Sequence, residues 1–283
     1  MRFHGSLEDH FADASNGAIE EPFTGFFHTI PHHPDAVGEK YREYPDLASI
    51  LKSACWLASA PWCRGLFTVS PYIARWLRAH VDVPVSALRH PAPEAPLPFD
   101  FEAFRRSEPR RVVHIGQWLR RTETFYALDC PGYEKLLLDV LSHHDWTHID
   151  ETVPAEQRSR VDVLARLPDG EFDVLMSRSV AFVDLYDAGA CNTVLECIRS
   201  GTPLLVNRLP GTEDYLGPGY PLYHEGAEHA ASLLADVEAI GEASRVLQKL
   251  GTEAVFDLDV FIESVAASDA YQALPMPGPT GPA

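Results

Sequence analysis

The sequence predicts an α/β protein with two Rossmann-like domains, a reduced N-terminal one and a larger C-terminal one, whose parallel sheets carry helices on both faces. Short apolar runs alternate with segments of helical spacing, most clearly after residue 110, and such alternation is typical of parallel sheets. Four prolines between residues 91 and 98 exclude a helix or a central strand there. The 283 residues suffice for two modest domains, each with its own core.

The proline-rich stretch is the natural linker between these domains, and we place the boundary near residue 105. The expected division is an N-terminal domain over residues 1–105, with the linker at about 91–105, a C-terminal domain over residues 106–265, and a C-terminal segment over residues 266–283. Four prolines and two glycines in residues 275–283 predict disorder at that end.

The secondary structure follows from periodicity and from Gly, Pro and Ser at segment ends. Strands are expected at residues 25–30, 65–69, 83–88, 112–115, 146–149, 161–167, 180–185 and 204–207, where short runs are apolar. Helices are expected at residues 47–58, 71–79, 133–142, 192–200 and 227–250, where apolar residues recur at helical spacing. Ser70 is the expected cap of the second helix. Asn192 or Thr193 is the expected cap of the fourth, which Gly201 ends.

The composition excludes several classes of protein. A formal net charge of −18 argues against a nucleic-acid partner. No run of 18 apolar residues is present, so no transmembrane segment is expected, and the polar N-terminal sequence favours a cytoplasmic location. The five cysteines contain no CxxC pair, which favours buried free thiols over a zinc site or disulfides.

A binding site is predicted in residues 180–217. A buried strand ends at Asp184, a loop of small residues follows, and a helix begins near Asn192. Ligands bind at the carboxyl ends of strands in such sheets, and the free N–H groups of Asn192, Thr193 and Val194 favour a phosphate. Glu196 lies one turn further on, where a carboxylate can accept two hydrogen bonds from ribose hydroxyls.

These residues carry a resemblance to a known family. The segments Thr193-Val194-Leu195-Glu196 and Arg199-Ser200-Gly201-Thr202-Pro203-Leu204-Leu205-Val206, the loop from Arg208 to Gly217, and His114-Ile115-Gly116 resemble the donor site of GT-B glycosyltransferases, similar to the retaining type. The resemblance covers residues 110–265 well and residues 20–92 loosely. It implies a short GT-B fold that transfers a sugar from a nucleotide diphosphate-sugar to a small-molecule, glycan or peptide acceptor, in the cleft between the domains. Because the sequence has no metal motif, no metal or other cofactor is expected.

The resemblance also implies roles for individual residues. Gly116 with Arg120 and Arg121 would hold the diphosphate together with Asn192, Thr193 and Val194, and Glu196 would hold the ribose. Asp184 and Asp187 would contact the sugar or act in catalysis. Many retaining members have an acid eight positions before the ribose glutamate, where this chain has Ala188.

His28 lies near the carboxyl end of the first predicted strand and is the candidate to contact the sugar or take a proton from the acceptor. Ser70 and His90 end strands at the same edge, although a helix cap and a linker residue explain them equally well. Pro31 and Pro34 argue against a metal site made of His28, His32 and His33.

Two other functions stay open. A non-catalytic module that binds a nucleotide-sugar would also explain the short N-terminal domain and Ala188. An epimerase or phosphorylase of related architecture is the third reading. The sequence contains no Walker loop, nucleophile elbow, HExxH motif, kinase signature or Gly-x-Gly-x-x-Gly fingerprint.

Overall fold

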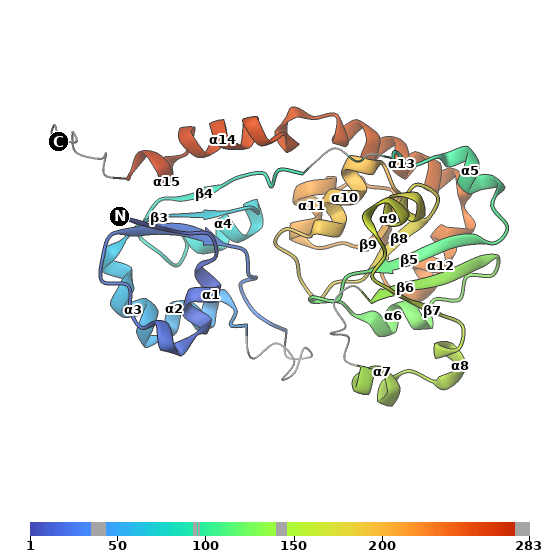
Figure 1. Cartoon of the computed structure of the whole chain (residues 1–283), viewed down its shortest axis with the longest axis horizontal. Coiled ribbons are helices and arrows are strands. Elements are labelled where there is room, and N and C mark those ends of the chain that lie inside the picture. Colours follow the sequence, from blue (N-terminus) through green and yellow to red (C-terminus); the bar gives the residue numbers. More distant parts are fainter. Residues whose placement is uncertain (35–43, 93–94, 96, 140–145, 275–283) are drawn as a thin grey trace. The chain divides into compact units, whose positions relative to one another are not determined.

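The computed structural model describes residues 1–34, 44–92, 95, 97–139 and 146–274. The chain divides into two compact units (Figure 1). Unit 1 comprises Met1–Pro91 and Asp257–Ala283, and unit 2 comprises Ala92–Phe256. Each unit contains one sheet whose strands are all parallel, which confirms the predicted fold class.

Unit 1 is the smaller unit, with four strands in the order β1-β2-β3-β4. The strands are β1 (Arg2–His4), β2 (Phe23–Phe27), β3 (Cys63–Thr68) and β4 (Val85–Ala87). The helices are α1 (Leu7–Ala12), α2 (Leu47–Lys52), α3 (Ala54–Ser59), α4 (Pro71–Arg78), α14 (Leu258–Ala267) and α15 (Asp269–Gln272), with 3-10 turns at Ala14–Asn16 and Ala60–Trp62.

Alternation along β2 divides the packing of unit 1 between the two faces of its sheet. Phe23 and Phe27 are fully buried in a cluster with residues of α1 to α4. Phe26 points to the other face and stacks on Phe261 of α14, with ring centroids 6.4 Å apart. Figure 1 accordingly shows α1, α2 and α3 on one side of this sheet and α14 and α15 on the other.

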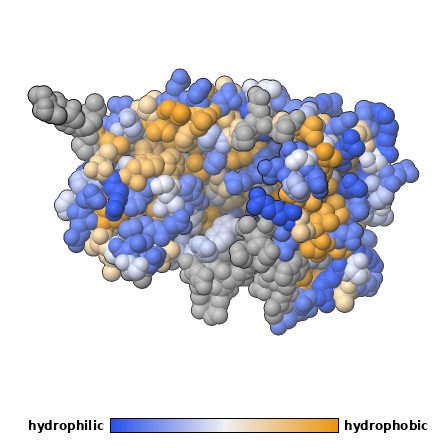
Figure 2. Space-filling view, in the orientation of Figure 1, coloured by the Kyte–Doolittle hydropathy of each residue, from blue (hydrophilic) through white to orange (hydrophobic). Residues whose placement is uncertain are grey.

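The last two described helices therefore complete unit 1. Ala270 of α15 is fully buried, and its N–H donates to the Ser86 hydroxyl of β4 at 3.1 Å. Helix α14 has no buried residue, and Leu258 and Ile262 are 61% and 56% exposed. Hydrophobic side chains are visible along it in Figure 2.

Unit 2 has six strands in the order β10-β9-β8-β5-β6-β7. The strands are β5 (Arg110–Ile115), β6 (Tyr133–Asp139), β7 (Asp162–Ala165), β8 (Val180–Val183), β9 (Leu204–Asn207) and β10 (Tyr223–His224). The helices are α5 (Phe101–Arg106), α6 (Thr122–Ala127), α7 (Trp146–Thr152), α8 (Ala155–Arg158), α9 (Asp169–Met176), α10 (Asn192–Ser200), α11 (Pro210–Leu216), α12 (Ala227–Ala235) and α13 (Val237–Gly251), followed by a 3-10 turn at Ala254–Phe256.

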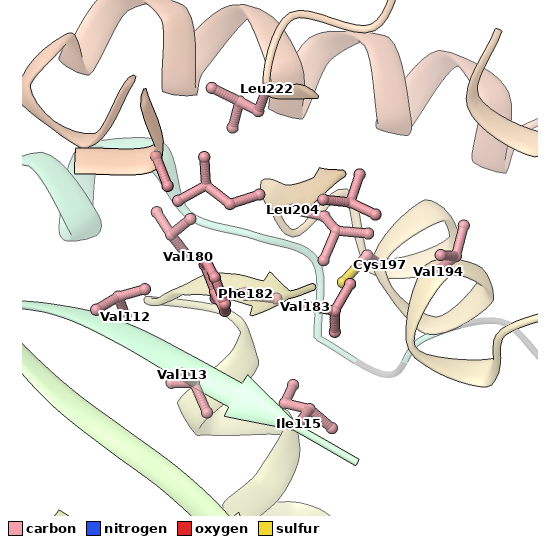
Figure 3. Close-up of a cluster of buried hydrophobic side chains, with 14 of the residues drawn as sticks. Val112, Val113, Ile115, Val180, Phe182, Val183, Val194, Cys197, Leu204 and Leu222 are labelled. Carbon is pink, nitrogen blue, oxygen red and sulfur yellow. The ribbon is translucent and has the colours of Figure 1, made fainter. Parts of the chain in front are cut away.

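The core of unit 2 forms around β5, β8 and β9. All four residues of β8 are buried, as expected of a parallel strand covered on both faces. Figure 3 shows Val113 and Phe182 on these strands, with Val194 and Cys197 of α10 in the same cluster. The strand order reverses between β5 and β8, and this switch point is where such sheets bind ligands.

Two predicted elements in unit 2 have the wrong type. The predicted helix at residues 133–142 contains strand β6, because Leu136, Leu137 and Leu138 are all buried between β5 and β7; burial in the sheet outweighs the helix propensity of leucine. The predicted strand at residues 146–149 is the start of α7. Ile149 and Val153, four residues apart, are both buried, as helical spacing requires.

The other predicted elements are present within a few residues of the expected bounds, except that the predicted helix at residues 227–250 is divided into α12 and α13 at Asp236, which has extended backbone and caps α13. The predicted helix at residues 47–58 is divided into α2 and α3 at Ser53, which has extended backbone and caps α3. Helix α10 has the predicted bounds, and Gly201 ends it in the left-handed conformation. The elements that were not predicted are β1, α1, α5, α6, α8, α9, α11, β10, α14 and α15.

The division of the chain differs from the predicted ranges at two places. Helix α5 belongs to unit 2, since Phe99 and Phe104 are part of its core, so the linker does not extend to residue 105. At the other end the chain returns to unit 1 at Asp257 instead of remaining in the C-terminal domain to residue 265. The predicted disorder of residues 275–283 lies outside the described residues.

In the described part of the chain, no helix combines the length and apolarity needed to cross a membrane. All five cysteines are free thiols, as predicted. Four of them are buried, and Cys55 is half-buried.

Candidate functional site

The predicted donor-site residues of unit 2 gather at the carboxyl ends of β5 and β8. Gly116 follows β5 with a φ of +78°, and a Cβ at this position would lie 3.1 Å from Nη2 of Arg120. Glycine is suited to this position because it adopts positive φ freely and allows the guanidinium to approach the main chain. Asp184 follows β8 directly and begins the loop that leads to α10.

Arg120 connects the end of β5 to the start of α10. Its Nη2 donates to Sγ of Cys191 at 3.2 Å and to Oγ1 of Thr193 at 3.4 Å. Its Nε and Nη1 donate to main-chain oxygens of Ile115 and Trp118, at 3.3 and 2.9 Å. The guanidinium is therefore held at the N-terminus of α10, where a helix already favours an anion.

Arg121 has a different environment from Arg120. Its Nη2 donates to Oδ1 of Asp184 at 2.6 Å, and its guanidinium lies 5.4 Å from the ring centroid of Tyr186. The Asp184 side chain is 5% exposed, whereas that of Arg121 is 36% exposed. The hydrogen bond to Asp184 raises the pKa of Arg121 above its ordinary value. Asp184 thus neutralises the charge of Arg121, and the Asp184 carboxylate is already engaged in this ion pair.

The N-terminus of α10 has no side-chain cap. The residue at the cap position is Cys191, with extended backbone, so the prediction of Asn192 or Thr193 as cap is wrong; both lie inside the helix. The first N–H groups of a helix have no partner within it. Those of Asn192, Thr193 and Val194 are therefore available in a region where Asn192 is exposed.

Glu196 lies one turn after the start of α10, and its side chain is exposed. Within the described part of the chain, its carboxylate takes part in no hydrogen bond or ion pair. Desolvation raises the pKa of Glu196, and the positive charge of Arg120 opposes this shift. The carboxylate is thus reachable by a ligand and already partly desolvated.

The loop before α10 is held by its own backbone and by α11. Oδ1 of Asp187 accepts a hydrogen bond from the N–H of Ala188 at 2.8 Å, so this carboxylate is also engaged. A Cβ on Gly211 of α11 would lie 1.8 Å from the main-chain oxygen of Ala188. Only glycine fits at this contact, which fixes α11 against the loop.

In unit 1, His28 is paired with a residue that the sequence analysis missed. Oε1 of Glu8, on α1, lies 2.8 Å from the main-chain N of His28 and 3.2 Å from its Nδ1. The Glu8 side chain is 14% exposed and that of His28 is 43% exposed. A carboxylate at Nδ1 favours a proton on that nitrogen and leaves Nε2 as the basic atom. Glu8 follows the Ser6 cap, but its distance of 20 residues from His28 gave no signal in the sequence.

The remaining candidates of unit 1 have local roles. The Ser70 hydroxyl caps α4 by accepting from the N–H of Ile73 at 3.4 Å, and Nδ1 of His90 lies 2.6 Å from the main-chain oxygen of Pro91. His32 packs edge-on against Trp76. No group of three metal-binding side chains occurs among the described residues.

No protein-family model matches the chain, and no curated protein matches it by sequence. Solved structures do match it. Sucrose-phosphate synthase from Thermosynechococcus elongatus aligns with a TM-score of 0.69 and 16% identity over 87% of this chain and 66% of its own. This chain thus spans about two thirds of that enzyme's length.

Two further solved structures are similar. HepE of Anabaena, solved in complex with UDP and glucose, aligns with a TM-score of 0.66 and 10% identity over 87% of this chain and 70% of its own. WaaG, a glycosyltransferase involved in lipopolysaccharide biosynthesis, aligns with a TM-score of 0.59 and 12% identity over 88% and 78%. The fold is that of the GT-B glycosyltransferases. At these identities the similarity establishes the fold and leaves the function to be argued from the site.

Proposed function

We propose that this GT-B protein is a nucleotide-sugar-dependent glycosyltransferase whose donor binds at the switch point of unit 2. The observation that carries the proposal is the Glu196 carboxylate, which is exposed and makes no hydrogen bond or ion pair to a described residue. It lies one turn from the uncapped N-terminus of α10. This arrangement suits a ligand that joins an anionic diphosphate to a ribose.

In the proposed complex, the N–H groups of Asn192, Thr193 and Val194 bind the diphosphate, and Glu196 accepts hydrogen bonds from the ribose hydroxyls. Gly116 leaves room beside Arg120, which supplies a positive charge. Arg121 contributes less, because Asp184 already neutralises it. The acceptor binds unit 1, where Glu8 holds Nδ1 of His28 and leaves Nε2 available to an acceptor hydroxyl.

The proposed reaction forms a bond between an acceptor hydroxyl oxygen and the anomeric carbon of the donor. The bond from that carbon to the diphosphate breaks, and the nucleotide diphosphate leaves with its electron pair. Arg120 and the N-terminus of α10 stabilise the charge that develops on the leaving group, so no metal or cofactor is assigned.

We favour retention at the anomeric carbon over inversion. Asp184 binds Arg121, and Asp187 binds the N–H of Ala188, so neither carboxylate of this loop is placed to act as a base on the acceptor. In retention the acceptor proton can pass to the departing phosphate oxygen, which needs no such base. The configuration of the product, read by NMR, tests this choice.

Calorimetry with UDP, GDP and ADP, each beside its nucleoside, tests donor binding. We begin with UDP because HepE was solved with it. The expected result is that one diphosphate binds much more tightly than its nucleoside, since the nucleoside lacks the group that α10 and Arg120 hold. Absence of binding for all three diphosphates would refute the proposal.

The second candidate function is a module that binds a nucleotide-sugar without turnover. The engagement of Asp184 and Asp187, together with Ala188, favours it. Incubation of the protein with nucleotide-sugars and a panel of glycan acceptors separates the two functions. Release of nucleotide diphosphate that depends on the acceptor supports the enzyme, whereas binding without release supports the module.

A further inference from the structure

Asn207, the last residue of β9, binds the main chain of Leu185 through its side chain. The Leu185 N–H donates to Oδ1 of Asn207 at 2.8 Å, and Nδ2 of Asn207 donates to the Leu185 oxygen at 2.8 Å. Asn207 is 7% exposed and Leu185 is 1% exposed. The amide thus satisfies both main-chain groups of a buried residue, as a neighbouring strand would.

This contact lies just beyond the end of the regular sheet. The pairing of β8 with β9 ends at Val183 and Val206, so Leu185 has no main-chain partner from β9. Asn207 is itself fixed, because its main chain is paired with His224 of β10 and its oxygen accepts from the Thr212 hydroxyl at 3.1 Å. The Asn207 side chain therefore takes the place of a paired strand for Leu185, which lies beyond the end of β8.

The opposite edge of the same segment is bound to the loop that carries both arginines. Leu185 forms an isolated antiparallel bridge with Arg120. The N–H of Arg121 donates to the Asp184 oxygen at 2.8 Å, and the N–H of Tyr186 donates to the Leu119 oxygen at 3.0 Å. Residues 184–186 are consequently held between the Asn207 amide and the main chain of residues 119–121.

We infer that Asn207 is a positioning residue of the donor site, which acts through Leu185 to set where Arg120 and Arg121 place their guanidinium groups. This inference rests on the proposed function for its ligand, a nucleoside diphosphate. Displacement of Leu185 moves the backbone of Arg120, whose Nη2 contacts the first turn of α10 at 3.4 Å. Small displacements matter here, because charge-assisted hydrogen bonds depend on distance and direction.

The test compares Asn207→Ala with the parent protein by calorimetry. Loss of the amide leaves both main-chain groups of Leu185 without their partner, and we expect UDP to bind about tenfold more weakly. Uridine affinity should not change, because uridine has no phosphates for Arg120 to bind. Thr202→Val is the matched control: it removes the buried hydrogen bond from Thr202 to the Met176 oxygen, at the other end of β9.

A second variant covers the case in which Asn207→Ala fails to fold. Asn207→Asp keeps the shape but loses the donor at neutral pH. When protonated, the carboxyl group both donates and accepts, as the amide does. We expect weak UDP binding at neutral pH and recovery toward the parent at acidic pH. Each value is taken relative to the parent at the same pH, since Asp184, Arg121 and His224 flank this position.

NMR of the Nε–H group of Arg120, which donates to the Ile115 oxygen, measures its placement without any nucleotide. A changed signal in Asn207→Ala and an unchanged one in Thr202→Val support the inference. If Asn207→Ala lowers the melting temperature but leaves both this signal and UDP affinity unchanged, Asn207 is only structural. If the parent binds no nucleotide, the proposed function fails, and the Nε–H signal alone decides the role of Asn207.

Discussion

The two units differ at the starts of the helices that follow their strands. In unit 1, α1, α2 and α4 begin at Ser6, Asp46 and Ser70, whose side chains accept hydrogen bonds from N–H groups of the first turn. In unit 2, α6, α9, α10 and α12 follow strands or the loops after them. Their cap residues make no such bond in the described structure; they are Arg121, Pro168, Cys191 and Gly226.

At the other end of α6, unit 2 does supply a partner. The buried Lys135 of β6 donates from Nζ to the main-chain oxygens of Tyr126 and Leu128, at 2.9 and 2.8 Å. Carbonyl groups at the end of a helix favour such a cation. Unit 1 thus caps the helices that follow its strands, whereas unit 2 satisfies a helix end and leaves the starts of its strand-following helices uncapped; its two side-chain caps, Asp100 and Asp236, belong to α5 and α13.

The largest expected difference between the units is at alkaline pH, because the buried Lys135 belongs to unit 2. Burial lowers the pKa of Lys135 from 10.5 to about 8. Between these values the unfolded chain holds a proton that the folded chain has lost, so the free energy of unfolding rises with pH. The rise should total about 3 kcal/mol between pH 8 and 10.5.

Urea unfolding of the parent and of Lys135→Met across this pH range measures the effect. The variant should lack the rise, and the difference isolates it from tyrosines and cysteines that titrate at higher pH, such as Cys130 with a pKa raised to about 11. Parallel curves for the two proteins would show that Lys135 is charged and well solvated in the folded state.

Glu196→Gln and Glu196→Ala test whether the open helix start of unit 2 serves a ligand. Loss of a charge-assisted hydrogen bond costs about 1.5–3 kcal/mol, or roughly ten- to a hundredfold in nucleotide affinity. The melting temperature should stay constant, because the side chain is exposed and makes no hydrogen bond to a described residue. Unchanged affinity in both variants would place the ribose elsewhere.

A pair of cap variants sharpens the contrast between the units. Ser70→Ala removes the cap of α4 and should destabilise the protein by about 1 kcal/mol. Cys191→Ser adds a hydroxyl cap to α10 and should stabilise it by a smaller amount, about 0.5 kcal/mol, while weakening nucleotide binding because the hydroxyl competes for the same N–H groups. Thermal unfolding and calorimetry measure both. Tighter nucleotide binding by Cys191→Ser would contradict the competition.

The smallest expected effect concerns the imidazole of His28 in unit 1. Glu8→Gln removes the carboxylate charge beside Nδ1 of His28, and the proton of the neutral ring should shift from Nδ1 toward Nε2. Nitrogen-15 NMR distinguishes the two tautomers directly. An Nε2–H tautomer already present in the parent would contradict the orientation assigned to His28.

Local signals in the sequence predicted the parts of the site that local structure creates. The apolar run of β8 and the helical spacing of α10 placed Asp184, Asn192 and Glu196 at one edge of a sheet. Gly116 and Arg120 were predicted from the resemblance to the GT-B donor site. Strand β6 was missed because its leucines also fit a helix, and only burial between two strands decides against one.

Contacts between distant segments were beyond the reach of that reasoning. Glu8 meets His28 across 20 residues, and Asn207 meets Leu185 across 22. Arg121 was predicted as a phosphate ligand from the resemblance to the GT-B donor site, but its partner Asp184 lies 63 residues away. The sequence shows which charges exist, and the fold decides which of them are already neutralised.

The return of α15 to unit 1 makes the chain a case of domain insertion. Residues 92–256 form one continuous stretch placed inside the sequence of the other unit. Expressed separately, this stretch retains its whole core, whereas residues 1–91 alone would lose Ala270 from its place against Gly65 and Ser86. The first unit can fold fully only after the second has been synthesised.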